Sequence, residues 1–155
     1  MSVSQPQSTH NQFGQLPEWD LSDLYPGVES DALKADMAFL DTETKAFEAD
    51  FKGKLDGLAK TGGLIDAVRR YEKLDEVFGR LGSFAYLNYA QNTGDGDRVK
   101  FLGDTQDKMT GLSTRILFFT LEINRIEDGV LDAAFENSAD LARYKPVFDR
   151  IRAMK

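Results

Sequence analysis

Apolar residues recur three, four or seven positions apart along most of the chain, which is the spacing of one face of an α-helix. The first such stretch begins after the capping residues Ser30 and Asp31 and runs to about Phe51. Lys52 and Gly53 supply a stop signal, because glycine readily adopts the left-handed backbone that ends helices. Its expected buried stripe is Leu33, Met37, Leu40, Phe47 and Phe51.

Two longer helices are predicted next, from about Gly63 to Asn92 and from about Asp97 to Asn124. The first has apolar positions at Leu64, Val68, Tyr71, Leu74, Phe78 and Leu81, and the second at Leu102, Met109, Leu112, Ile116, Phe119 and Ile123. The second would be about 42 Å long. Its end, "RILFFTLEI", is apolar nearly all round, so we expect burial on more than one side. The glycine-rich "LDGLAKTGG" and the turn-rich "NTGDGD" are expected to be connectors.

Two shorter helices are predicted at the end of the chain, over about Glu127–Phe135 and Ala139–Met154. Pro146 lies inside the second and should break it near Lys145, because proline lacks a backbone donor. No segment alternates with period two for long enough to be a strand. The sequence therefore predicts an all-α fold: an antiparallel bundle of long helices with a non-helical N-terminal segment and two short C-terminal helices.

Residues 1–15 are polar and nearly uncharged, and we expect them to form a flexible leader before a helical domain at residues 16–155. The segment "WDLSDLYPG", Trp19 to Gly27, is too rich in turn formers for a regular element yet carries a heavy apolar load. We expect Trp19 and Tyr25 to anchor it on the helices, with Trp19 largely buried and Trp19→Ala costing roughly 3 kcal/mol. The alternative is that the segment only covers a local hydrophobic patch.

Glycines and aromatic residues interrupt the predicted 63–92 helix. Gly79 and Gly82 indicate either the close approach of a neighbouring helix or a bend. "FAYLNYA", Phe84 to Ala90, is more typical of core packing than of a ligand-stacking site. Within it, Tyr86 and Tyr89 are the candidates to face a wet cleft, because phenols often lie with one end in water.

The charge balance is acidic, with 26 Asp and Glu against 19 Lys and Arg and a net charge of −7. The charges are interspersed, so a solvated surface is expected and a basic nucleic-acid-binding face is not. No apolar run approaches the length of a membrane span, and the N-terminus does not have the pattern of a secretory signal. With no cysteine in the chain, we expect a cytoplasmic protein that interacts with neither nucleic acid nor membrane.

The sequence offers no complete catalytic or metal-binding motif. The chain has one histidine, His10, and no cysteine, so neither a zinc site of the H-E-x-x-H type nor a histidine-dependent triad can be assembled. "DGDRVKFLGD" from Asp95 lacks the ligands of a calcium loop, and "GRLGSF" from Gly79 lacks the third glycine of a dinucleotide fingerprint. We therefore expect no catalytic residue, cofactor or stoichiometric zinc in this chain.

An ordered set of segments resembles the N-terminal region of oligoendopeptidase F, in the thimet oligopeptidase-like family of zinc metallopeptidases. The set is "LPEWDLSDLYPG", "DALKADMAFL", "FKGKL", "YEKLDEVFGRLGSFAYLNYAQNTGD", "ILFFTLEINRI" and "LARYKPVFDRIR", and it covers roughly Pro17 to Arg152. No single one of these segments is diagnostic. The family's zinc ligands and general base, which H-E-x-x-H and a later glutamate supply, match no position here.

The resemblance implies a helical wall beside the substrate channel of a cytoplasmic peptidase that cleaves short peptides. Its partners would be the catalytic domain of the same polypeptide, which carries the zinc, and peptide substrates. Because "RAMK" lies inside a helical pattern, we expect the chain to stop before the catalytic part. The alternative is a stand-alone acidic helical adaptor protein. Without its catalytic domain the chain should form a homodimer through apolar residues around Ile116–Ile123 and through Val147, Phe148 and Ile151.

Overall fold

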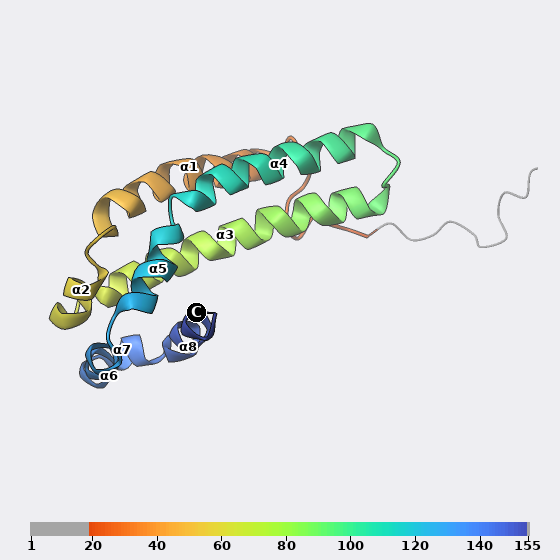
Figure 1. Cartoon of the computed structure of the whole chain (residues 1–155). Helices are drawn as coiled ribbons and strands as arrows, with labels where there is room; N and C mark the ends of the chain where they lie inside the picture. The colour runs from red at the N-terminus through yellow and green to blue at the C-terminus, as the bar shows by residue number, and fades with distance from the viewer. Residues whose placement is uncertain (1–18, 155) are drawn as a thin grey trace, which may run out of the picture.

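Three long helices lie side by side in the computed structural model, which describes residues 19–154 (Figure 1). They are α1 (Asp31–Phe51), α3 (Leu64–Gln91) and α4 (Gly96–Thr114). α3 runs antiparallel to both α1 and α4 and packs against each of them. No strand occurs between residues 19 and 154, so the all-α prediction is confirmed. The predicted leader, residues 1–15, lies outside the described residues.

The ends of α1 follow the predicted signals. The Ser30 Oγ accepts a hydrogen bond from the Leu33 amide at 3.3 Å, which caps the first turn. After the helix ends at Phe51, Gly53 has a φ of 78°, in the left-handed region that favours glycine. α3 likewise occupies nearly the predicted range.

The segment "LDGLAKTGG" is not a simple connector, and that prediction is wrong. Leu55–Thr61 forms α2, which buries Leu55 and Ala59. Its first turn is capped from a distance, because the Glu122 carboxylate accepts hydrogen bonds from the amides of Gly53 at 2.6 Å and Leu55 at 3.3 Å. Glycine content suggested a loop, but tertiary burial and this remote cap stabilise a short helix.

The predicted single helix from Asp97 to Asn124 is also wrong, because it is broken at residues 115–116. α4 ends at Thr114, and α5 (Leu117–Arg125) turns away across α3 (Figure 1). Two hydrogen bonds of the 3₁₀ type, between residues three apart, stabilise the bend. The Ile116 amide donates to the Ser113 carbonyl, and the Phe119 amide donates to the Ile116 carbonyl. The bend places α5 so that Phe118, Phe119 and Ile123 enter the core.

The C-terminal region consists of α6 (Asp128–Asn137), α7 (Ala139–Ala142) and α8 (Lys145–Ala153). The break expected near Lys145 is confirmed, since Pro146 lies in the first turn of α8, where its missing donor is harmless. The Arg152 guanidinium on α8 donates to the Ile123 and Ile126 carbonyls at the end of α5, at 3.1 and 2.9 Å. This contact holds α8 against α5.

The packing of α8 on α5 buries most of the apolar patch on which the homodimer prediction rested. Phe119, Ile123 and Phe148 are at most 1% exposed, and Ile151 is 8% exposed. The expectation that these residues lie exposed is therefore wrong, because α5 and α8 contact each other and pack on further helices: Phe119 stacks on Tyr71 of α3, and Phe148 packs against Phe135 of α6. Leu117, Leu121 and Met154 remain exposed. The homodimer itself stays a prediction.

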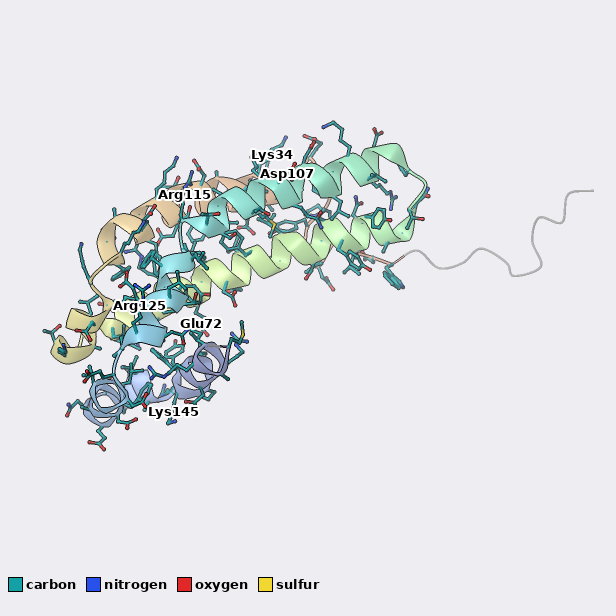
Figure 2. The ribbon with its side chains drawn as sticks, in the orientation of Figure 1. Lys34, Glu72, Asp107, Arg115, Arg125 and Lys145 are labelled. Carbon is teal, nitrogen blue, oxygen red and sulfur yellow. The ribbon has the colours of Figure 1, made fainter. Side chains whose placement is uncertain are left out.

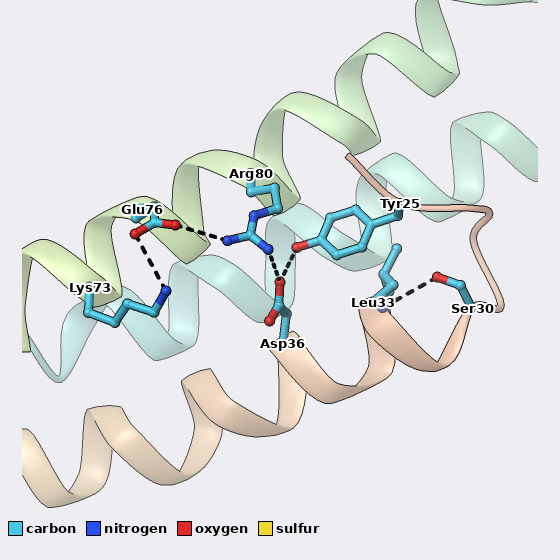
Figure 3. A network of polar contacts seen from close by, with 7 residues as sticks. All are labelled: Tyr25, Ser30, Leu33, Asp36, Lys73, Glu76 and Arg80. Atoms are coloured by element: carbon cyan, nitrogen blue, oxygen red, sulfur yellow. Dashed lines mark hydrogen bonds and ion pairs between the residues drawn. The ribbon is translucent and has the colours of Figure 1, made fainter. Parts of the chain in front are cut away.

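The N-terminal segment is anchored by one of its two predicted aromatics. Tyr25 is 1% exposed and packs edge-on against Phe84 of α3, with 5.3 Å between ring centroids. Its hydroxyl donates to the Asp36 carboxylate of α1, which also accepts from Arg80 of α3 (Figure 3). Trp19, in contrast, is 61% exposed, so its predicted burial is wrong. The Trp19 backbone carbonyl accepts a hydrogen bond from the Gln91 side chain.

The two glycines of α3 differ in their surroundings. A Cβ on Gly82 would lie 3.4 Å from the Met109 methyl of α4, so a neighbouring helix does approach there. At Gly79 a Cβ would meet nothing within 4 Å. Gly79 therefore does not mark a close helix contact.

Candidate functional site

Helix α4 is the least covered of the three long helices. It has 19 residues, yet only Thr105 and Leu112 are buried. An amphipathic helix of that length normally buries a continuous stripe. Here open grooves lie on both sides of α4.

The first hollow, which we call the α3–α4 groove, has a volume of about 830 Å³. α3 contributes Tyr71, Asp75 and Phe78, and α4 contributes Met109 together with a row of hydroxyl and amide side chains. Ile116, Leu117 and Thr120 close the end next to α5. The size is within the range of small-molecule and peptide sites, about 300–1,000 Å³.

The hydroxyl groups along α4 face this groove mainly as hydrogen-bond acceptors. The Thr110 hydroxyl donates to the Gln106 carbonyl at 2.8 Å, and the Ser113 and Thr114 hydroxyls both donate to the Thr110 carbonyl at 3.0 Å. Because each proton is directed at the helix backbone, the oxygen lone pairs remain for another donor.

The charged side chains that line the groove are carboxylates. Asp75 and Asp107 lie on opposite walls, both exposed, and neither forms an ion pair with any residue between 19 and 154. No lysine or arginine is among the lining residues. Burial raises the pKa of Tyr71, Asp75 raises it further, and Arg150 of α8 opposes the rise. Arg150 is therefore a cation near the Tyr71 end.

Tyr86 and Tyr89 lie on the same side of α3 as the groove. Positions 71, 75, 78, 82, 86 and 89 are separated by three or four residues, so they share one helix face. Tyr86 is 58% exposed and Tyr89 is partly buried, with 6.4 Å between their ring centroids. They continue the aromatic lining toward the α3–α4 turn. That Tyr86 and Tyr89 face a substrate channel stays a prediction.

The second hollow, the α1–α4 groove, has a volume of about 740 Å³ and a different charge pattern. Its apolar lining comes from Leu33, Met37, Phe101 and Leu112. Its edges carry charges of both signs, among them Lys34, Asp107 and Arg115, which are labelled in Figure 2.

One end of the α1–α4 groove is closed by a polar bridge. The Arg115 guanidinium donates to the Asp41 carboxylate at 3.0 Å and to the Thr44 hydroxyl at 3.2 Å. The hydrogen bond from Arg115, followed by that from Lys45, lowers the pKa of Asp41. This bridge joins α4 to α1 just before the chain bends into α5.

Sequence reasoning missed the groove residues Asp75, Asp107 and Thr110. The sequence did contain a signal for this face of α3. Its aromatic residues continue at steps of three and four residues past the positions that the core requires. What no pattern showed is that α4 would leave this face of α3 uncovered.

No metal or membrane site emerges from the described part of the chain. Residues 19–154 contain no cluster of three or more His, Cys, Asp or Glu side chains placed to hold a metal ion, and His10 lies outside this range. The zinc implied by the family resemblance therefore has no ligand set among them. None of the helices within residues 19–154 has the length and apolar content to cross a membrane.

Comparison with known proteins gives no relative. No protein-family model matches the chain, and neither the curated proteins nor the solved structures contain a significant match.

Proposed function

We propose that this chain is the N-terminal helical domain of an oligoendopeptidase F-like zinc metallopeptidase of the cytoplasm. In this proposal the α3–α4 groove forms part of the wall of the substrate channel, and the domain alone is not catalytic. The zinc and the catalytic residues belong to the catalytic domain of the same polypeptide. Short peptides are the substrates of the whole enzyme.

Two observations support the proposal. The first is the ordered resemblance across Pro17 to Arg152. The second, which comes from the structure, is the exposure of α4. α4 has 19 residues, of which two are buried, and a groove lies on each side of it. Such exposure of an amphipathic helix is typical of a surface that another part of the polypeptide covers.

The two grooves suit two different neighbours. The α1–α4 groove, with its apolar lining and charges of both signs, fits the packing of another helix from the same polypeptide. The α3–α4 groove has hydroxyl oxygens, aromatic rings and open carboxylates. That lining suits a transiently bound ligand such as a peptide substrate, which is replaced at each turnover.

The deciding experiment is to read the coding sequence beyond Lys155 and to express the whole reading frame. The proposal expects a continuous frame that encodes H-E-x-x-H, with a product that cleaves a fluorogenic peptide and loses that activity with a chelator. A matched variant with the H-E-x-x-H glutamate changed to glutamine controls for contaminating peptidases. A stop codon directly after Lys155, or activity that ignores the chelator, would overturn the proposal.

A stand-alone helical adaptor is the second candidate. The α1–α4 groove favours it, because an apolar trough between two parallel helices is the form that accepts an amphipathic helix. The stop codon that overturns the first proposal would support this one.

A further inference from the structure

We infer that the α3–α4 groove selects extended peptides that carry an arginine or lysine side chain next to an apolar one. This inference deepens the proposed function and rests on it, since it names the substrate class of the proposed channel wall. It follows from the charge, the hydrogen-bonding capacity and the apolar lining of the groove.

The charge lining favours a cation. Asp75 from α3 and Asp107 from α4 line the two walls of the groove, whose lining contains no lysine or arginine, and Arg150 of α8 acts electrostatically on Tyr71 at one end. The α1–α4 groove, by contrast, has Lys34, Lys108 and Arg115 among its lining residues. The two grooves therefore differ in net lining charge: three carboxylates, Asp107 among them, balance the cations of the α1–α4 groove, whereas the α3–α4 groove is lined by Asp75 and Asp107 and by no lysine or arginine.

The hydrogen-bonding lining favours a ligand rich in donors. The hydroxyl protons of Thr110, Ser113 and Thr114 are engaged by helix carbonyls, which leaves their oxygens as acceptors. An extended peptide offers free backbone N–H groups to such acceptors, whereas a helix uses its N–H groups internally. Guanidinium and ammonium groups are donors without acceptors. The groove thus favours an extended cationic peptide over a docked helix.

The apolar lining gives the second specificity element. Phe78, Met109 and Leu117, which we call the apolar strip, line the groove together with the carboxylates, and Leu117 is 54% exposed. An aliphatic or aromatic side chain of the ligand would cover this strip. Burial of such a side chain is favourable by roughly 25 cal/mol per Å² of apolar surface.

The test is a titration of the isotopically labelled chain with short capped peptides, followed by NMR amide shifts. One peptide carries phenylalanine and arginine, the second replaces arginine by citrulline, and the third replaces it by glutamate. Citrulline keeps the shape of arginine and removes its charge. We expect shifts at Phe78, Thr110 and Ser113, with binding that falls in the order arginine, citrulline, glutamate.

Substitutions then test the two carboxylates. Asp75→Asn and Asp107→Asn should each weaken binding of the arginine peptide about three-fold, and together about ten-fold, since exposed ion pairs contribute modestly. Binding of the citrulline peptide should change little. Asp132→Asn on α6 removes the same charge away from the groove and is the matched control. Because all three side chains are exposed, the variants should fold, and circular dichroism checks this.

Three outcomes would overturn the inference. Equal affinity for the arginine and citrulline peptides would show that the groove does not select charge. Peptide-induced shifts confined to other surfaces would show that the site is elsewhere. Shifts at the groove that grow with protein concentration, without peptide, would show that a second copy of the chain occupies it. Each can occur while the reading frame still encodes H-E-x-x-H, so failure of the inference is distinguishable from failure of the proposed function.

Discussion

The Tyr25 hydroxyl donates a hydrogen bond to the Asp36 carboxylate at 2.5 Å, and this bond ties the irregular N-terminal segment to α1. The same carboxylate oxygen accepts from the Arg80 guanidinium of α3 at 3.2 Å, and Arg80 also pairs with Glu76 (Figure 3). The N-terminal segment, α1 and α3 therefore meet at one carboxylate.

Removal of this hydroxyl should destabilise the fold moderately. Tyr25→Phe keeps the buried ring and loses the bond to a charged acceptor, so we expect a loss of about 1.5 kcal/mol. Tyr25→Ala also removes the ring, and its loss should reach about 3–5 kcal/mol. Urea unfolding followed by circular dichroism measures both. Equal stability of wild type and Tyr25→Phe would mean that the bond contributes nothing.

The same tyrosine should make the fold sensitive to alkali. Burial, and then the bond to Asp36, raise the pKa of Tyr25 above its ordinary value, while Arg80 opposes the rise. As the pH rises above about 10, the unfolded chain loses this proton before the folded chain does. The stability contributed by the protonated phenol is thus complete below pH 10 and is lost as the pH climbs toward the folded pKa. Unfolding at pH 8, 10 and 11 should show a steeper decline for wild type than for Tyr25→Phe.

Substitution of the only tryptophan should have little effect. Trp19 is 61% exposed, so Trp19→Ala should change the free energy of unfolding by no more than about 0.5 kcal/mol. Its native fluorescence should be close to that of free indole in water. A strongly blue-shifted emission from the native chain would contradict the exposed position.

The remote cap of α2 gives a local prediction. Glu122→Ala leaves the Gly53 and Leu55 amides without their acceptor, and we expect a loss of about 1–2 kcal/mol. Hydrogen exchange should accelerate first in Leu55–Thr61. Glu136→Ala, an exposed change on α6, is the control. Unchanged exchange in α2 would mean that water replaces the carboxylate without loss.

Gly79 offers a stabilising change. An added Cβ meets no neighbour there, and alanine is a better helix former, so Gly79→Ala should raise stability by about 0.5–1 kcal/mol. Gly62→Ala should lower it, because Gly62 has a φ of 87° that alanine tolerates poorly. Thermal melts of the two variants should shift in opposite directions. A lower melting temperature for Gly79→Ala would reveal a contact that the geometry does not show.

The sequence by itself determined the helical class, the extents of α1 and α3, and the break near Lys145. Each depends on local physics: the spacing of apolar residues, a capping serine, a glycine free to adopt positive φ, or a proline without a donor. These signals lie within a few residues of the feature they specify. At these positions tertiary packing reinforces the local signals and does not override them.

Only the tertiary structure decided the bend at residues 115–116, the helix at Leu55–Thr61 and the exposure of Trp19. The bend brings Phe119 onto Tyr71, whose rings stack with 4.1 Å between centroids, and α2 depends on a carboxylate more than sixty residues away. The α3–α4 groove is likewise a feature that only the tertiary structure decided. It exists because α1 and α4 both pack on α3 and leave one face of α3 uncovered, and the periodicity of a single helix carries no information on which neighbours will cover it.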